Sequence, residues 1–125
     1  MLADTTVNVT AATDRVAVLE GLSNVSGRSP YNKCCSNNGA LMAGLAYDAH
    51  TKDIRPDGQP NGIAGKQTID TFWLDVLEFQ KYKADNQYYL ATKYGGFKVP
   101  DGYNADTNTT PLPNALWHNN GLTQR

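Results

Sequence analysis

NNGALMAGLAYDAH (residues 37–50) and GKQTIDTFWLDVL (residues 65–77) decide the fold that we predict for this chain. In the first stretch a good N-cap, Asn38, precedes apolar residues at helical spacing: Leu41, Met42, Leu45, Ala46 and Ala49. In the second stretch apolar side chains point to both faces of an extended chain, as in strands that a parallel sheet buries under helices. The sequence therefore predicts an α/β fold, a partial parallel sheet with flanking helices. Trp73 and Leu74 should be buried on opposite faces of the strand Thr68–Leu77, and Leu74→Ala should cost about 2–5 kcal/mol.

Composition limits the function classes. The chain has 125 residues and a formal net charge of −1, and its 11 basic and 12 acidic residues are spread along it. No basic face points to nucleic acid or an anionic membrane, and no apolar run is long enough for a membrane span. No signal peptide follows Met1. Because charged residues are only 18% and Asn, Thr, Gly and Tyr are abundant, we expect a mature or excised segment of an extracellular or bacterial cell-surface protein.

The chain is read as a single domain or fragment in three parts: residues 1–36, with N-terminal strands and a loop; residues 37–97, the helix–strand–helix core; and residues 98–125, an extended tail. We expect the tail to pack through Leu112, Leu116 and Trp117.

Two further strands and a second helix complete the predicted elements. Alternating or short apolar runs predict strands at Thr5–Thr10 and Arg15–Leu19. The second helix is Asn86–Tyr94, capped by Asp85 and ended by Gly95. A sheet of two or three strands leaves both edges unpaired. We therefore expect the chain to be stable only in contact with other protein, with residues 100–125 as the arm that reaches across.

Cys34 and Cys35 are adjacent, and the sequence has no other cysteine. An ordinary disulfide needs its Cα atoms farther apart than the ~3.8 Å between neighbours. Two free thiols, a strained vicinal disulfide and pairing with another chain or a missing segment stay open. We favour thiols that are idle in a loop or paired elsewhere.

Ordered motifs between Asn37 and about Trp117, roughly two-thirds of the chain, resemble a known family. An Ala/Gly-rich helix leads into Tyr-Asp-Ala-His-Thr-Lys-Asp-Ile-Arg-Pro (residues 47–56). The Gly-Lys-Gln turn and the strand follow, and then Tyr-Leu-Ala-Thr-Lys-Tyr-Gly-Gly-Phe (residues 89–97). These motifs resemble PilY/PilC-type type IV pilus tip proteins. The resemblance implies the C-terminal half of a von Willebrand factor A-like domain in a non-enzymatic surface protein that acts in adhesion and in pilus extension and retraction.

The resemblance also shows what this chain lacks. An A-type domain holds a divalent cation with an Asp-x-Ser-x-Ser turn, and this sequence contains none. Glu20 can stand in place of the family's Asp-Gly turn, but most of the remaining ligands would be missing. We therefore expect no cofactor and no tightly bound divalent ion at Glu20 or at His50.

Two other groups of polar residues are candidate metal ligands. Asp48, His50 and Asp53 carry zinc- or iron-ligating groups, but their spacing at a helix end does not place all three on one face. The segment that contains Asp101, Asn104, Asp106 and Asn108 copies the first oxygen positions of a calcium loop and lacks its glycine and distal Glu. We predict calcium there to be weaker than about millimolar, if bound at all.

These observations favour a non-enzymatic cell-surface protein of a type IV pilus system. The alternative is a small secreted subunit of an extracellular filament. A small hydrolase that uses Asp48, Asp53 or Asp75 ranks third, because no nucleophile–base pair is evident. The expected partners are other protein chains: a pilin, the rest of a pilus-tip protein or further copies. Glycosylation sequons, which matter only if the source glycosylates them, begin at Asn8, Asn24 and Asn108.

Overall fold

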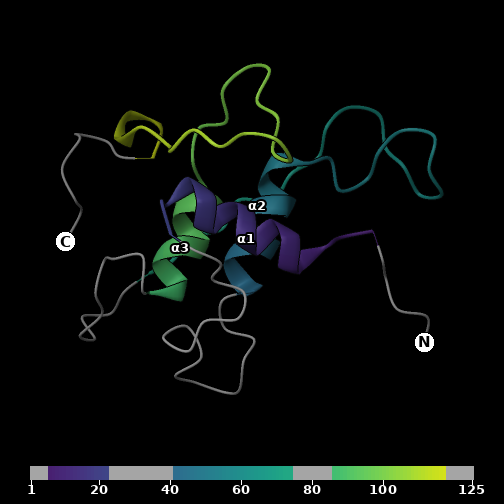
Figure 1. Cartoon of the computed structure of the whole chain (residues 1–125). Coiled ribbons are helices and arrows are strands. Elements are labelled where there is room, and N and C mark those ends of the chain that lie inside the picture. Colours follow the sequence, from purple (N-terminus) through teal and green to yellow (C-terminus); the bar gives the residue numbers. More distant parts are fainter. Residues whose placement is uncertain (1–5, 23–40, 75–85, 118–125) are drawn as a thin grey trace.

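Three short α-helices form the centre of the protein in a computed structural model, which describes residues 6–22, 41–74 and 86–117. They are α1 (Val9–Leu19), α2 (Leu41–Thr51) and α3 (Gln87–Tyr94), and a 3-10 helix, η2 (Asn114–Leu116), follows them. Figure 1 shows the α-helices gathered together with long connections around them. α2 contacts both α1 and α3. None of the helices in these ranges has the length and apolar character to cross a membrane.

α1 occupies residues that were predicted as strands, so the strands at Thr5–Thr10 and Arg15–Leu19 are wrong. Its N-cap is Asn8, whose side-chain oxygen accepts from the Ala11 N–H at 3.0 Å. This bond satisfies one of the donors that a helix start leaves free. The residues that α1 buries are Thr13, Val16, Ala17 and Leu19, which follow helical spacing and not the two-residue period of a strand.

The crossing of α1 and α2 leaves no room for a side chain at Gly44. A Cβ built there would lie 2.1 Å from Thr13 Oγ1 and 2.4 Å from Thr13 N. Thr13 is itself fully buried, and its hydroxyl donates to the Val9 carbonyl at 2.7 Å. Gly44 therefore lets the two helix backbones approach closely.

α2 and α3 agree with the two predicted helices. Asn86 caps α3, because its side-chain oxygen accepts from the N–H groups of Tyr88 and Tyr89 at 2.9 and 3.3 Å. At the other end the N–H of Gly95 donates to the Ala91 carbonyl at 2.8 Å, as expected of a C-cap. The predicted cap Asp85 is therefore wrong by one residue, and Asn38, the predicted cap of the first helix, lies outside the described residues.

Side chains from all three helices and from the C-terminal part make one hydrophobic core. Its largest fully buried members are Tyr47, Tyr94, Phe97, Leu19, Leu90 and Val16. Leu112 is buried in this core, and Leu116 and Trp117 pack against it. The expected packing through these three residues is confirmed, while residues 118–125 lie outside the described part.

The predicted partial parallel sheet is wrong, and so is the A-domain-like half fold that contains it. The described residues contain no strand, and Phe72 and Leu74 are each 86% exposed. Residues 68–74 instead run past the C-terminal ends of two helices. The Ile69 N–H donates to Ala49 O of α2 at 2.9 Å, and the Thr71 N–H donates to Gly95 O at 2.7 Å. These carbonyls at the helix ends accept hydrogen bonds from the N–H groups that would otherwise donate to a neighbouring strand.

Trp73 is half-buried and stacks on Tyr88 of α3, with ring centroids 5.9 Å apart. Of Trp73 and Leu74, which were both expected to be buried on opposite faces of a strand, only Trp73 is therefore partly covered. Residues 75–77 of that predicted strand lie outside the described part.

Candidate functional site

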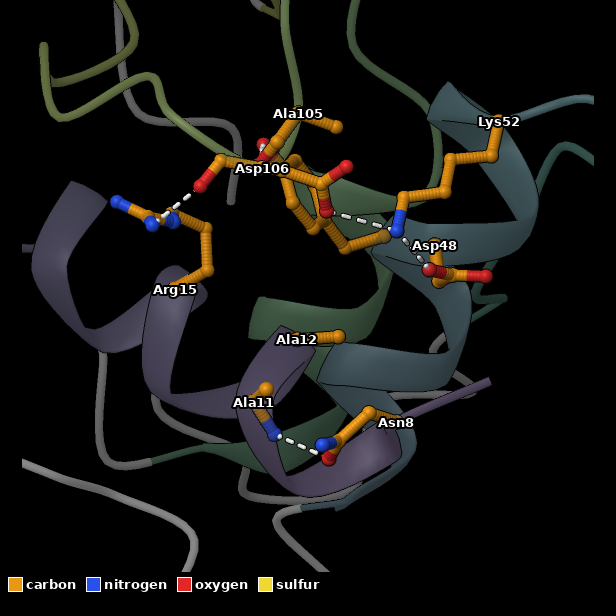
Figure 2. Close-up of a pocket in the computed structure, with 9 residues that line it drawn as sticks. Asn8, Ala11, Ala12, Arg15, Asp48, Lys52, Ala105 and Asp106 are labelled. Atoms are coloured by element: carbon orange, nitrogen blue, oxygen red, sulfur yellow. Dashed lines mark hydrogen bonds and ion pairs between the residues drawn. The ribbon is translucent and has the colours of Figure 1, made fainter. Parts of the chain in front are cut away.

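A small polar cavity lies where α1, α2 and the loop of residues 103–108 meet. It has a volume of about 110 Å³ and is lined by Asn8, Ala11, Ala12, Arg15, Tyr47, Asp48, Lys52, Ala105 and Asp106. Figure 2 shows Lys52 between two carboxylates, and the Lys52 Nζ is 3.0 Å from Asp48 Oδ1 and 2.8 Å from Asp106 Oδ1. The bond to Asp106 is the main cause that raises the pKa of Lys52. Lys52 thus supplies a positive charge that bridges the carboxylates of α2 and the loop at this junction.

The loop with the calcium-like pattern is ordered by contacts within the protein. Asn104 Oδ1 accepts from the N–H groups of Asp106 and Thr107 at 3.0 and 3.2 Å. Arg15 donates to the carbonyls of Asp106 and, at 3.3 Å, of Asn108. Asp101 is exposed in a turn before the loop. Of the oxygens in the calcium pattern, Asn104 Oδ1 therefore accepts from backbone N–H groups and Asp106 Oδ1 pairs with Lys52 Nζ. The weak calcium site stays a prediction.

Tyr47 joins this loop to the core. Its hydroxyl donates to Ala105 O at 3.0 Å and lies 2.8 Å from the hydroxyl of Tyr103. Burial, reinforced by the bond to Tyr103, raises the pKa of Tyr47 far above its ordinary value. Tyr47 thus stays a neutral hydroxyl that anchors the loop.

Sequence reasoning missed the second polar cluster, in which Glu20 at the C-terminus of α1 meets α3. The Glu20 carboxylate accepts from Lys93 Nζ and, at 2.6 Å, from the hydroxyl of Tyr94. The side chains of Glu20 and Lys93 are only 10% and 11% exposed. Lys93 Nζ also lies 4.6 Å from the ring centre of Trp117. The residue weighed as a metal ligand is thus half of a buried ion pair, and no feature of the sequence links it to Lys93.

The trio Asp48, His50 and Asp53 does not converge on one point. Asp48 pairs with Lys52, whereas Asp53 Oδ1 accepts from the N–H groups of Arg55 and Gln67 at 3.0 and 3.2 Å. Among the described residues no group of three metal-ligating side chains comes together.

His50 is buried in the last turn of α2 and connects three segments. Its Nε2 lies 2.7 Å from the carbonyl oxygen of Phe97. Its Nδ1 lies 2.8 Å from Asp70 Oδ1, within ion-pair distance. His50 therefore holds the end of α2 against residue 97 and against the segment of residues 68–74.

Residues 53–67 form a closed surface loop that follows α2 (Figure 1). The Ile54 N–H donates to Gln67 O at 3.0 Å, and the Ile63 N–H donates to Arg55 O at 3.0 Å. The side-chain amide of Gln67 donates to the carbonyls of residues 63, 64 and 65. Compact surface loops of this kind are frequently functional.

Exposed apolar side chains gather in this loop and in the segment that follows it. They are Ile54, Ile63, Ile69, Phe72 and Leu74. Exposed apolar side chains are a feature of protein-interaction sites where they lie together. This surface is the strongest candidate for function, because the polar groups of the cavity are largely occupied by one another. The sequence predicted three of these apolar residues, Ile69, Phe72 and Leu74, to lie in a buried strand, and it did not predict burial of Ile54 or Ile63. Cys34, Cys35, Asn24 and Asp75 lie outside the described residues.

The chain is 52% identical over 88 residues to a protein of Xylella fastidiosa named type IV pilus biogenesis factor PilY1 homolog. The match covers 68% of this chain and 7% of that protein. No protein-family model matches the chain. No solved structure matches it either. The similarity supports a PilY1-like identity and links the chain to type IV pilus biogenesis.

Proposed function

We propose that the chain is a non-enzymatic, cell-surface part of a type IV pilus biogenesis factor that acts by binding other protein. The observation that carries this proposal is the 52% identity over 88 residues to the PilY1 homolog. Because the chain spans 7% of that relative, the activity of a whole biogenesis factor, adhesion included, is part of the proposal.

The structure supports a binding role over a catalytic one. Two of the carboxylates that a hydrolase would need are engaged, Asp48 with Lys52 and Asp53 with the backbone of its own loop. Five large apolar side chains within residues 54–74 are exposed, which suits a protein partner: Ile54, Ile63, Ile69, Phe72 and Leu74.

The experiment is an in-frame deletion of the coding sequence for residues 41–117 in the source bacterium, complemented with the intact gene. Surface pilin is measured by immunoblot of sheared pili, and adherence is measured in parallel. Loss of surface pili supports a role in biogenesis. Normal piliation with reduced adherence supports the adhesin role. Normal values of both contradict the proposal.

A structural subunit of an extracellular filament is the second candidate, and the exposed apolar side chains of Ile54 and Ile63 favour it. Negative-stain microscopy of the purified chain separates the two candidates. Filaments formed by the chain alone support the subunit, whereas their absence at high concentration favours the biogenesis factor.

A further inference from the structure

The segment of residues 68–74 is hydrogen-bonded along one edge and open along the other. The N–H groups of Ile69 and Thr71 point to the helix ends, where they bind Ala49 O and Gly95 O. In an extended chain alternate N–H groups point to opposite edges. The N–H groups of Asp70, Phe72 and Leu74 therefore face the other way, and the described part of the chain supplies them no backbone acceptor.

The side chains agree with this geometry. Thr71 and Trp73 are half-buried, and Phe72 and Leu74 between and after them are exposed, which is the two-residue period of an extended chain. Gly95 allows the close approach on the bonded edge, since a Cβ there would lie 2.8 Å from Thr71 Cβ. The segment is thus held along one edge by two hydrogen bonds, and its other edge has no backbone partner among the described residues.

We propose that residues 70–74 pair antiparallel with the same residues of a second copy of this chain, about a two-fold axis at Phe72. This inference stands apart from the pilus assignment, because it rests only on the geometry of the segment.

The positions of the open N–H groups fit this self-pairing. In an antiparallel pair, residues that exchange two hydrogen bonds alternate with residues that exchange none. With the axis at Phe72, that residue faces its own copy and Asp70 faces Leu74 of the second copy. Every open N–H group then meets a carbonyl across the axis.

Charge and composition favour a second copy as the occupant. Asp70 faces an apolar residue in this register, so no carboxylates oppose each other, and the two Phe72 rings form a cross-strand aromatic pair. Residues 68–74 contain no Pro and no Lys, which proteins use to protect open edges from self-pairing.

The size of the contact sets its strength. A pair of such short segments buries far less than the roughly 800 Å² per partner of a standard interface. The dimer should therefore be weak and should appear only at high concentration. A two-fold contact closes on itself, so it yields dimers and not filaments.

The test is sedimentation velocity of the full 125-residue chain over a concentration series up to about 1 mM, where weak complexes become populated. In a mixture of isotope-labelled and unlabelled chains, NMR should show contacts between the α-protons of Thr71 and Trp73 of different copies, since this pair has no hydrogen bonds and lies closest. Dimer formation with these contacts is the expected result. A chain that stays monomeric, or a dimer without these contacts, would overturn the proposal.

A matched set of variants distinguishes pairing through backbone hydrogen bonds from non-specific association through an exposed apolar side chain. Phe72→Pro removes the central N–H and should abolish the dimer. Phe72→Ser keeps the N–H and should weaken association by about tenfold through loss of the aromatic pair. Ile63→Ser, an exposed apolar residue outside the segment, should change nothing. Circular dichroism and a thermal melt check that each variant folds. Dimerisation of a folded Phe72→Pro variant equal to wild type would refute backbone pairing, as would an Ile63→Ser loss as large as that of Phe72→Ser.

Discussion

The α1–α2 crossing and the segment of residues 68–74 are both held in place, by opposite means. At the crossing, Gly44 and Thr13 meet with no space left, and order comes from packing. Along residues 68–74, order comes from hydrogen bonds to helix ends, while Phe72 and Leu74 remain in solvent. Apolar sequence alone therefore does not mark a core, since hydrogen bonds can fix a path without burying its side chains.

The largest effect is expected at the crossing. Gly44→Ala adds a Cβ 2.1 Å from Thr13 Oγ1 and 2.4 Å from a backbone nitrogen, so helices must separate. Overpacking of this kind costs about 3 kcal/mol, at the upper end of the usual range. Urea unfolding measures the change. Leu45→Ala, at an exposed position of the same helix, is the control and should cost less than about 1 kcal/mol. Equal effects of the two changes would show that the crossing is looser than described.

An effect of similar size is expected at the buried ion pair. Lys93→Met leaves the Glu20 carboxylate buried beside Tyr94 without its cation. Breaking one side of a buried pair costs about 3 kcal/mol. The control is Lys66→Met, at an exposed position in the surface loop, which should be nearly neutral. A loss at Lys93 no larger than at Lys66 would mean that the pair is solvated.

Alkaline pH should weaken the same side of the core. Burial, together with the charge of Glu20, raises the pKa of Tyr89 to about 12 from 10.0. Because the folded pKa lies above the unfolded one, this contribution to stability is complete below pH 10 and falls as pH rises towards 12. Thermal melts between these pH values measure it. Tyr89→Phe should flatten the decline, and an unchanged pH profile in that variant would contradict the assignment.

The smallest effect is expected at Leu74. The sequence predicted a cost of about 2–5 kcal/mol for Leu74→Ala as a core change. Because this side chain is 86% exposed, we now expect less than about 1 kcal/mol. Urea unfolding beside the Gly44→Ala variant gives the contrast directly. A larger loss of unfolding free energy would show that Leu74 is buried in a core and contradict its exposed position.

Several elements could be predicted from local sequence, because their causes are local. Gly95 ends α3 as predicted, the start of α3 differs from the prediction by one residue because Asn86 is the cap in place of Asp85, and the apolar spacing around Tyr47 is that of a helix. The link to type IV pili also followed from motifs in order along the chain.

Other elements depend on distant partners and could not be predicted. The strand predicted at Thr5–Thr10 is an exception with a local cause, because Asn8 is the N-cap of a helix that begins at Val9. The prediction of a sheet was wrong because the N–H groups of residues 69 and 71 donate to carbonyls at helix ends. Glu20 and Lys93 form an ion pair although they are far apart in the sequence, and no local sequence pattern predicts this contact. The expected dependence on other protein rested on sheet edges, on two long loops and on the tail as an arm that reaches across. The described part of that arm packs Leu112, Leu116 and Trp117 onto the core of this chain instead. The dependence itself stays a prediction.

Amide hydrogen exchange of the dilute 125-residue chain, read residue by residue by NMR, tests the central claim most directly. The account predicts slow exchange at Ile69 and Thr71, whose N–H groups bind helix ends. It predicts fast exchange at Phe72 and Leu74, whose N–H groups face solvent. Slow exchange at Phe72 and Leu74 at low concentration would contradict the account, because it would place both edges of this segment inside a sheet.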